Sequence, residues 1–195
     1  NGDEGSAIHY GGDHYFAKPT DLWGEPTFRK GTLYFYNNTV VINGTSGQVF
    51  QLSTTEESAQ VWNNVFYFAP TVTYPSLRAS SADYASSSEF KNYWTSGGNL
   101  TLGKNWSSTT LADSDPWHTV PGTVTGWSNL IKGTTLPVDK NTFIPTSGSP
   151  VVDTAQANLT AVTAYPVQYQ YDVSTFSVKT RAVNGAAADI GAVER

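Results

Sequence analysis

Apolar and polar residues alternate along several short stretches of this chain, and the alternation recurs in register. Residues 33–41 (LYFYNNTVV) and 59–67 (AQVWNNVFY) each place an Asn-Asn pair after an alternating run, and the second Asn of the two pairs is Asn38 and Asn64. Carrying that register backward reaches Asp13, and carrying it forward reaches Asn105. Successive side chains of a strand point to opposite faces, so the pattern predicts short strands with one buried face.

Three columns of equivalent positions follow from this register. Two columns are apolar and two residues apart, and we expect both to face the interior; they hold Ile8, Leu33, Ala59 and Leu100, then Tyr10, Phe35, Val61 and Leu102. The third column is polar and holds Asp13, Asn38, Asn64 and Asn105. The positions beside the apolar columns, among them Tyr34, Tyr36 and Trp62, are predicted to face outward.

A repeat of about 20–50 residues indicates stacked supersecondary units. No helical period lies between the strands, so the repeat predicts a parallel β-solenoid, in which each turn of chain pairs with the next turn. Asn suits the bend between strands because it tolerates left-handed backbone geometry. Stacked Asn side chains also hydrogen-bond to each other along the axis. A β-sandwich with two similar hairpins is the alternative.

Two stretches resemble a known family. The segment GTLYFYNNTVV (31–41) resembles a rung of the right-handed parallel β-helix proteins of the pectate-lyase-like superfamily. SGSPVVDTA (147–155) and AADIGAVE (187–194) together resemble the SPAID…DIGAFE C-terminus of bacterial secreted β-helix repeat proteins, although Thr154 and Ala155 stand where that pattern usually has a Gly. The resemblance implies an all-β, right-handed parallel β-helix that is secreted or exposed at the cell surface. Relatives include polysaccharide lyases, glycoside hydrolases and non-catalytic surface proteins.

The length of 195 residues fits a single domain, 1–195. We expect regular rungs in 1–68 and 97–108, loop insertions in 69–96 and 109–146, and a C-terminal capping segment in 147–195, in which 164–183 forms late strands over the end of the coil and DIGAVE the final strand. No cap is visible before Ile8. The expected occupant of that N-terminal face is therefore upstream rungs or another subunit.

Charge and composition exclude several classes of function. The chain has 11 Lys and Arg against 16 Asp and Glu, so it offers no basic surface for nucleic acid. It has no Cys, which excludes disulfides and thiol chemistry, and no apolar run approaches the length of a transmembrane helix. It also has no Met, so Asn1 is expected to follow a cleavage or to begin a fragment.

Titratable residues are densest near the start of the chain. Elimination from a uronate needs a base, an acid and a cation that neutralises the carboxylate. His9, His14, Lys18 and Arg29 are the candidates for these catalytic roles. Hydrolysis instead needs paired carboxylates, for which the acidic residues of this region are candidates, and a turn at GGDH is the structural alternative.

Aromatic residues indicate a class of ligand. Flat rings with polar groups suit the faces of sugar rings, and Tyr34, Tyr36, Trp62 and Trp106 are the predicted carbohydrate-binding residues. Burial under later loops is the alternative. No cofactor is expected, and calcium is the one candidate ion, at Asp113, Asp115 and His118, unless DSDPWH is simply a turn.

These observations support two classes of function. The chain is either part of an extracellular carbohydrate-active protein that binds or cleaves a polysaccharide, or a non-catalytic structural or adhesive module that assembles through its N-terminal face. The few cationic residues count against an acidic glycan and favour a neutral glycan or a structural role.

Overall fold

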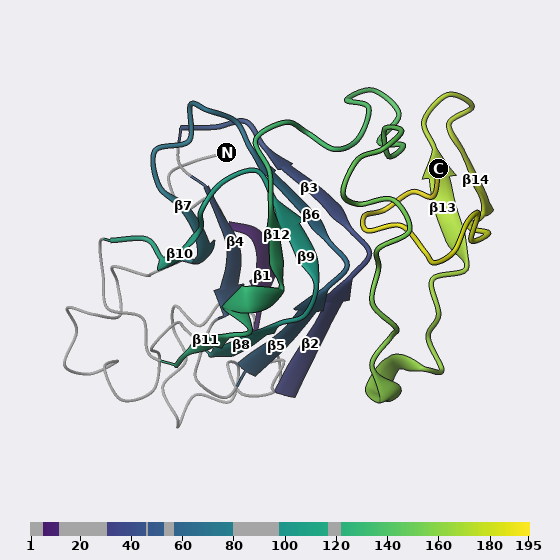
Figure 1. The fold of residues 1–195 in the computed structure, drawn as a ribbon. Coiled ribbons are helices and arrows are strands. Elements are labelled where there is room, and N and C mark those ends of the chain that lie inside the picture. Colours follow the sequence, from purple (N-terminus) through teal and green to yellow (C-terminus); the bar gives the residue numbers. More distant parts are fainter. Residues whose placement is uncertain (1–5, 12–30, 46, 53–56, 80–97, 117–121) are drawn as a thin grey trace.

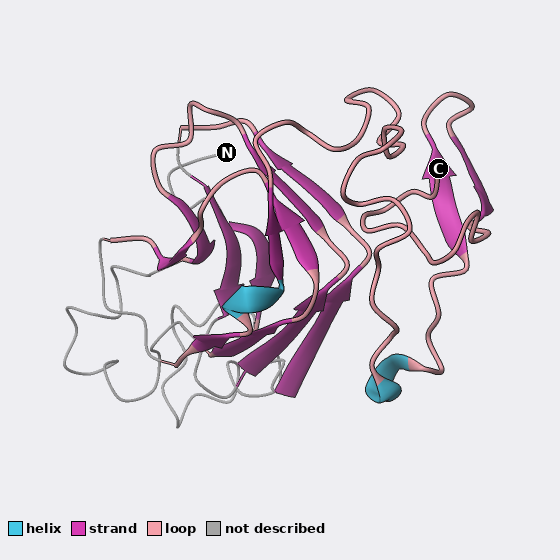
Figure 2. Ribbon diagram, viewed as in Figure 1, coloured by secondary structure: helices cyan, strands magenta, loops and turns pink. Residues whose placement is uncertain are grey.

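The computed structural model describes residues 6–11, 31–45, 47–52, 57–79, 98–116 and 122–195. This part of the chain consists of strands and connecting loops, with only two short 3₁₀ turns, η2 (Trp127–Asn129) and η3 (Thr160–Val162), as Figure 2 shows. Neither turn approaches the length needed to cross a membrane, and no other helix occurs in the described residues.

Twelve strands form three sheets of four. Sheet A contains β1 (Ser6–Tyr10), β4 (Gly47–Leu52), β7 (Pro75–Arg78) and β10 (Ala112–Ser114). Sheet B contains β2 (Gly31–Tyr36), β5 (Glu57–Trp62), β8 (Asn99–Leu102) and β11 (Val124–Thr125). Sheet C contains β3 (Thr39–Ile42), β6 (Val65–Phe68), β9 (Asn105–Ser107) and β12 (Leu130–Lys132).

The chain visits sheets A, B and C in turn, four times over (Figure 1). Each of β1 to β9 pairs in parallel with the strand three places later in the chain, which is its equivalent in the next passage. One passage through the three sheets is called a coil here. The apolar columns are in register as predicted: Leu33 lies beside Ala59, which lies beside Leu100. The fold is therefore all-β with stacked parallel sheets, and the two Asn-Asn pairs do not lie in antiparallel hairpins.

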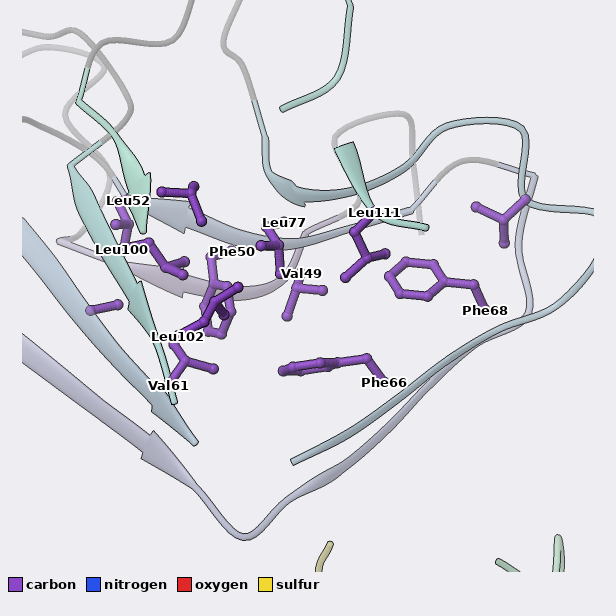
Figure 3. Close-up of a cluster of buried hydrophobic side chains, with 13 residues drawn as sticks. Val49, Phe50, Leu52, Val61, Phe66, Phe68, Leu77, Leu100, Leu102 and Leu111 are labelled. Carbon is purple, nitrogen blue, oxygen red and sulfur yellow. The ribbon is translucent and has the colours of Figure 1, made fainter. Parts of the chain in front are cut away.

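The core fills the space between the three sheets. Figure 3 shows side chains from all three sheets directed toward one another, with Phe50 of β4, Phe66 of β6 and Leu102 of β8 among them. Phe50 makes edge-to-face contacts with Phe66 and with Phe35. Burying side chains of this size contributes about 1.5–3 kcal/mol each. Leu33 and Phe35 are only half-buried, because they lie in an edge strand of sheet B.

The bend between sheets B and C, at residues 37–38, 63–64 and 104–105, is called the Asn corner here. Asn64 Oδ1 accepts hydrogen bonds from the backbone nitrogen and Nδ2 of Asn38, at 2.9 and 3.1 Å. Asn105 Oδ1 accepts the same two bonds from Asn64, at 3.0 and 2.9 Å. The predicted stacking of the Asn column is therefore confirmed for three coils.

A fourth asparagine continues this ladder by another route. Asn64 Nδ2 donates to Phe35 O and Asn105 Nδ2 donates to Val61 O, each reaching the preceding coil. In the last coil Leu130 is adjacent to Asn105, but Asn129 Nδ2 donates to Leu102 O at 2.9 Å. Because of the turn η2, Asn129 lies one position before the residue that matches Asn105 in the repeat. The sequence register therefore does not identify Asn129 as a member of the ladder.

The structure corrects the first column of the repeat. Ile8 and Tyr10 lie in sheet A beside Phe50 and Leu52, and not in sheet B beside Leu33 and Phe35. A five-residue alternating strand fits any face of a coil, so alternation alone could not assign β1 to a sheet. Asp13, placed in the Asn column, lies outside the described residues.

The loop assignments are also corrected. Strands β7, β10, β11 and β12 lie within 69–96 and 109–146, which were assigned to loops. These strands have only two to four residues, too few to show a period of two. Residues 169–180 do form late strands, but DIGAVE forms none. The segment of DIGAVE packs beside the Asn corner (Figure 1). Residues 164–183, which were expected over the end of the coil, lie on the same side, where Tyr36 bonds to Tyr165.

Replacing Asn64 by Ala should lower the free energy of unfolding by about 2–4 kcal/mol, because it leaves several buried backbone and amide groups unpaired. Equilibrium denaturation in urea measures the loss. Asn43→Ala is the matched control: Asn43 is exposed, and its replacement should change stability by less than about 0.5 kcal/mol. Equal losses in both variants would contradict a stabilising ladder.

Candidate functional site: a cleft at the Asn corner

The C-terminal segment, residues 147–195, packs against the outside of the Asn corner (Figure 1). The first Asn of the second pair holds it there. Asn63 adopts a left-handed backbone with φ of 57°, and its side chain pairs with the backbone of Gln156. Asn63 Nδ2 donates to Gln156 O at 2.9 Å, and Gln156 N donates to Asn63 Oδ1 at 2.8 Å. Asn63 O accepts a further bond from Gly191 N.

The two asparagines of a pair therefore have different roles. The second Asn points along the axis and builds the ladder, whereas the first takes the left-handed bend and turns its side chain away from the sheets. Left-handed geometry costs Asn less than other residues with a side chain. Asn37 has the same geometry in the preceding coil, with φ of 56°.

The C-terminal segment buries two of the four predicted carbohydrate-binding aromatics. Trp62 is 1% exposed; its ring stacks on Tyr36 at 4.5 Å, and Nε1 donates to Asn158 Oδ1 at 3.4 Å. Trp106 is fully buried with Val151 and Ile190. The prediction that Trp62 and Trp106 present free faces to a sugar is wrong, because the segment that covers them lies far away in the sequence.

The other two aromatics remain partly accessible. Tyr34 is 38% exposed and meets Trp62 edge-on. Tyr36 is half-buried, and its hydroxyl donates to Tyr165 O at 2.6 Å. Tyr165 itself is largely exposed.

The two halves of the C-terminal sequence motif pack together. Ala155 N donates to Ala188 O, and Ile190 N donates to Val151 O. Asp153 N donates to Asp189 Oδ1 at 2.8 Å. The motif thus forms a compact unit, although 31 residues of chain separate its halves in the sequence (156–186).

A buried ion pair stabilises this unit. Glu194 Oε1 accepts bonds from Arg181 Nε and Nη2, at 3.0 and 2.7 Å. The remaining Arg181 donors reach the carbonyls of Gly191 and Asp189. Burial raises the pKa of the Glu194 carboxyl, while hydrogen bonds and charge from Arg181 act against that rise. Both charges are therefore satisfied within the protein.

Between the Asn corner and the C-terminal segment lies a half-open cleft of about 400 Å³, called the corner cleft here. Its walls are small or apolar residues and a few polar groups: Asn37, Ala155, Gln156, Ala157, Asn158, Pro166, Val167, Arg181, Val183, Ala187, Ala188 and Glu194. A concave site with an apolar lining and a few convergent polar groups is typical of ligand-binding pockets.

Asn37 is the polar group in this cleft that most clearly lacks a role in the fold. Its side-chain amide makes no hydrogen bond to any described residue. The equivalent amide of Asn63 makes two hydrogen bonds to the backbone of Gln156. Asn158 Nδ2 is likewise uncommitted within the described chain. The corner cleft thus presents neutral donors and an acceptor to whatever enters it.

Of the four predicted catalytic residues, the structure describes one, His9. His9 is exposed on β1, beside Gln51 in sheet A, and does not line the cleft. His14, Lys18 and Arg29 lie outside the described residues. The structure therefore does not test their predicted roles.

The calcium candidates have other contacts where they are described. Asp113 accepts a hydrogen bond from Arg78 Nε at 2.7 Å. Asp115 is buried, and its backbone nitrogen donates to Arg78 O in β7. His118 lies outside the described residues. Across those residues no group of three or more His, Asp or Glu side chains could hold a metal ion.

Sequence reasoning missed most of the cleft. Gln156, Asn158 and Arg181 carry no periodic signal that points to a site, and the AADIGAVE motif that contains Glu194 indicates architecture and not a binding site. Asn37 did carry a sequence signal, because it belongs to the repeated Asn-Asn pair. Only the second Asn of each pair was assigned a structural role.

Comparison with known proteins gives no relative: no family model, no curated protein and no solved structure matches this chain.

Asn63→Gly should loosen the C-terminal segment, because Gly keeps the left-handed bend but removes the two bonds to Gln156. Trypsin cleavage after Arg181, which is 4% exposed, should then become faster. Asn37→Gly is the matched control with the same backbone and no such bonds, and its cleavage rate should equal that of the parent. Equal rates for all three proteins would show that Asn63 does not hold the segment.

Proposed function

We propose that this protein is a right-handed parallel β-helix module that binds a neutral glycan in the corner cleft. The resemblance of its rung and its C-terminal motif to secreted β-helix proteins supports an extracellular setting.

The proposed winding is supported by the order of the sheets. Consecutive passages through A, B and C leave parallel neighbours in every sheet. Crossover connections between parallel strands of one sheet are right-handed in about 98% of cases. A chain that makes this crossover three times in succession, as four passages through the sheets require, would wind into a right-handed β-helix.

The free amide of Asn37 carries the proposal of glycan binding. One coil away, the equivalent amide of Asn63 uses its donor and its acceptor together on one peptide group. Asn37 offers the same donor and acceptor pair to the corner cleft. Two neighbouring hydroxyls of a sugar ring present a matching acceptor and donor, and each hydroxyl can play either role.

The electrostatics of the cleft favour a neutral sugar. Arg181 and Glu194 neutralise each other, so neither is free to pair with an acidic substituent. The rings of Tyr34 and Tyr165 are exposed close to the corner, and such rings suit the apolar faces of sugars. These features support binding, and the assignment of a reaction to this chain stays a prediction.

A non-catalytic adhesive role is the second candidate. It is favoured by the unusual number of exposed apolar side chains in the C-terminal segment, described below. An adhesive module and a glycan-binding module are compatible, since many surfaces that proteins adhere to carry sugars.

Asn37→Ala should reduce retention on neutral polysaccharides in affinity electrophoresis by about tenfold or more, as expected for loss of about 1.5 kcal/mol of hydrogen bonding. Asn43→Ala, an exposed Asn outside the cleft, should bind as the parent does. Trp62→Ala is unsuitable as a binding test, because removing a buried aromatic costs about 3–5 kcal/mol of stability. The proposal fails if the folded parent is retained by none of a panel of neutral glycans.

A further inference from the structure

Exposed apolar side chains are concentrated in one hairpin and its flanks. Ten large apolar residues are exposed in the described chain, and six of them lie within 165–183: Tyr165, Tyr169, Tyr171, Phe176, Val178 and Val183. The hairpin consists of β13 (Tyr169–Asp172) and β14 (Ser177–Thr180), which pair with each other and with no other described strand (Figure 1). Exposed apolar patches that fold stability does not need commonly mark interaction surfaces.

The two faces of this hairpin differ. Gln170 is buried, and its Oε1 accepts a hydrogen bond from Glu194 N, so its face rests on the C-terminal unit. The opposite face carries Tyr169 and Tyr171 of β13, with Thr180 and Val178 beside them on β14. No described element covers that face; its apolar side chains are at least half exposed, and Thr180 is exposed as well.

The turn of the hairpin contains an unfavourable choice of residue. Phe176 has φ of 51° and is 79% exposed. A bulky side chain in the left-handed region is disfavoured relative to Gly or Asn, and a phenyl ring in water contributes no burial. The left-handed backbone and the exposed ring of Phe176 do not stabilise the isolated chain. A phenyl ring at this position is therefore consistent with contact to another molecule.

The free edge of β14 can be assigned atom by atom. Arg181 N donates to Gln168 O at 2.8 Å, so residues 168 and 181 form a hydrogen-bonded pair. Such pairs alternate along antiparallel strands, which makes Lys179 and Ser177 point their backbone groups toward β13. The N–H and C=O groups of Val178 and Thr180 therefore point outward, with no described strand to receive them.

We infer that β14 of a second copy of this chain pairs antiparallel with this edge, which joins the two hairpins into a four-stranded sheet. The strand is self-complementary about Val178. In a two-fold arrangement the two Val178 residues lie opposite each other and exchange backbone hydrogen bonds, and the two apolar faces become one continuous surface.

Charge supports a second copy as the occupant. In this register Lys179 lies opposite Ser177 of the other strand, so the two lysines do not oppose each other. Lys179 Nζ is already paired with Asp172 Oδ2 at 3.1 Å within its own hairpin. The edge thus lacks the unpaired lysine that commonly protects edge strands from pairing.

Sedimentation velocity of the full chain over a concentration series tests this inference. The parent should show a reversible dimer, and Val178→Lys and Val178→Pro should each weaken the association at least tenfold. Proline is tolerated where the edge N–H faces solvent, so Val178→Pro should keep the hairpin while removing one donor. Circular dichroism confirms that each variant folds.

Val41→Lys is the matched control, because Val41 is exposed in β3, an edge strand of sheet C. It should associate as the parent does. Amide exchange adds a residue-level measurement: on dimerisation, exchange should slow at Val178 and Thr180 more than at the already paired Ser177 and Lys179.

The inference is overturned if the parent stays monomeric up to about 1 mM, or if Val41→Lys and not Val178→Lys abolishes the dimer. It is also overturned if the hairpin face binds only a glycan or another protein. None of these outcomes bears on glycan retention by the Asn37 variants, so the proposed function is tested separately.

Discussion

The stacking of asparagine amides at the corner between sheets B and C is the interaction on which the rest of the structure depends. Asn64 and Asn105 are fully buried, and a buried amide without partners would be strongly destabilising. Here each of them bonds to its neighbour in the ladder and to carbonyls of two coils. The satisfied network therefore fixes both the bend and the register of every coil that it joins.

This constraint also creates the outer surface of the corner. At the two Asn-Asn pairs, the residue before the ladder asparagine completes a sharp left-handed bend, which directs its side chain outward; Lys104, the residue before Asn105, does not have this geometry. At Asn63 that outward amide anchors the C-terminal segment, and at Asn37 it opens into the corner cleft. Structure inside the coil and a candidate site outside it thus arise from the same repeated dipeptide.

The sequence predicted the sheets better than the site. Alternation and the Asn column placed β2, β5 and β8 in register, because both signals are local to each coil. β1 was misplaced, since five alternating residues fit any face, and β10 to β12 were too short to show alternation. The burial of Trp62 and Trp106 depends on residues about 45 to 100 positions away, a contact that no local pattern encodes.

Coil length is not constrained in the way that the corner is. Successive ladder asparagines are separated by 26 residues in one step and by 41 in the next, yet both steps give the same side-chain bonds. The additional residues of the longer step lie in the sequence between β7 and β8, where the chain passes from sheet A to sheet B. The number of residues between these two strands can therefore change without altering the ladder, so a foreign peptide or a small domain inserted between β7 and β8 should leave the neighbouring coils stacked.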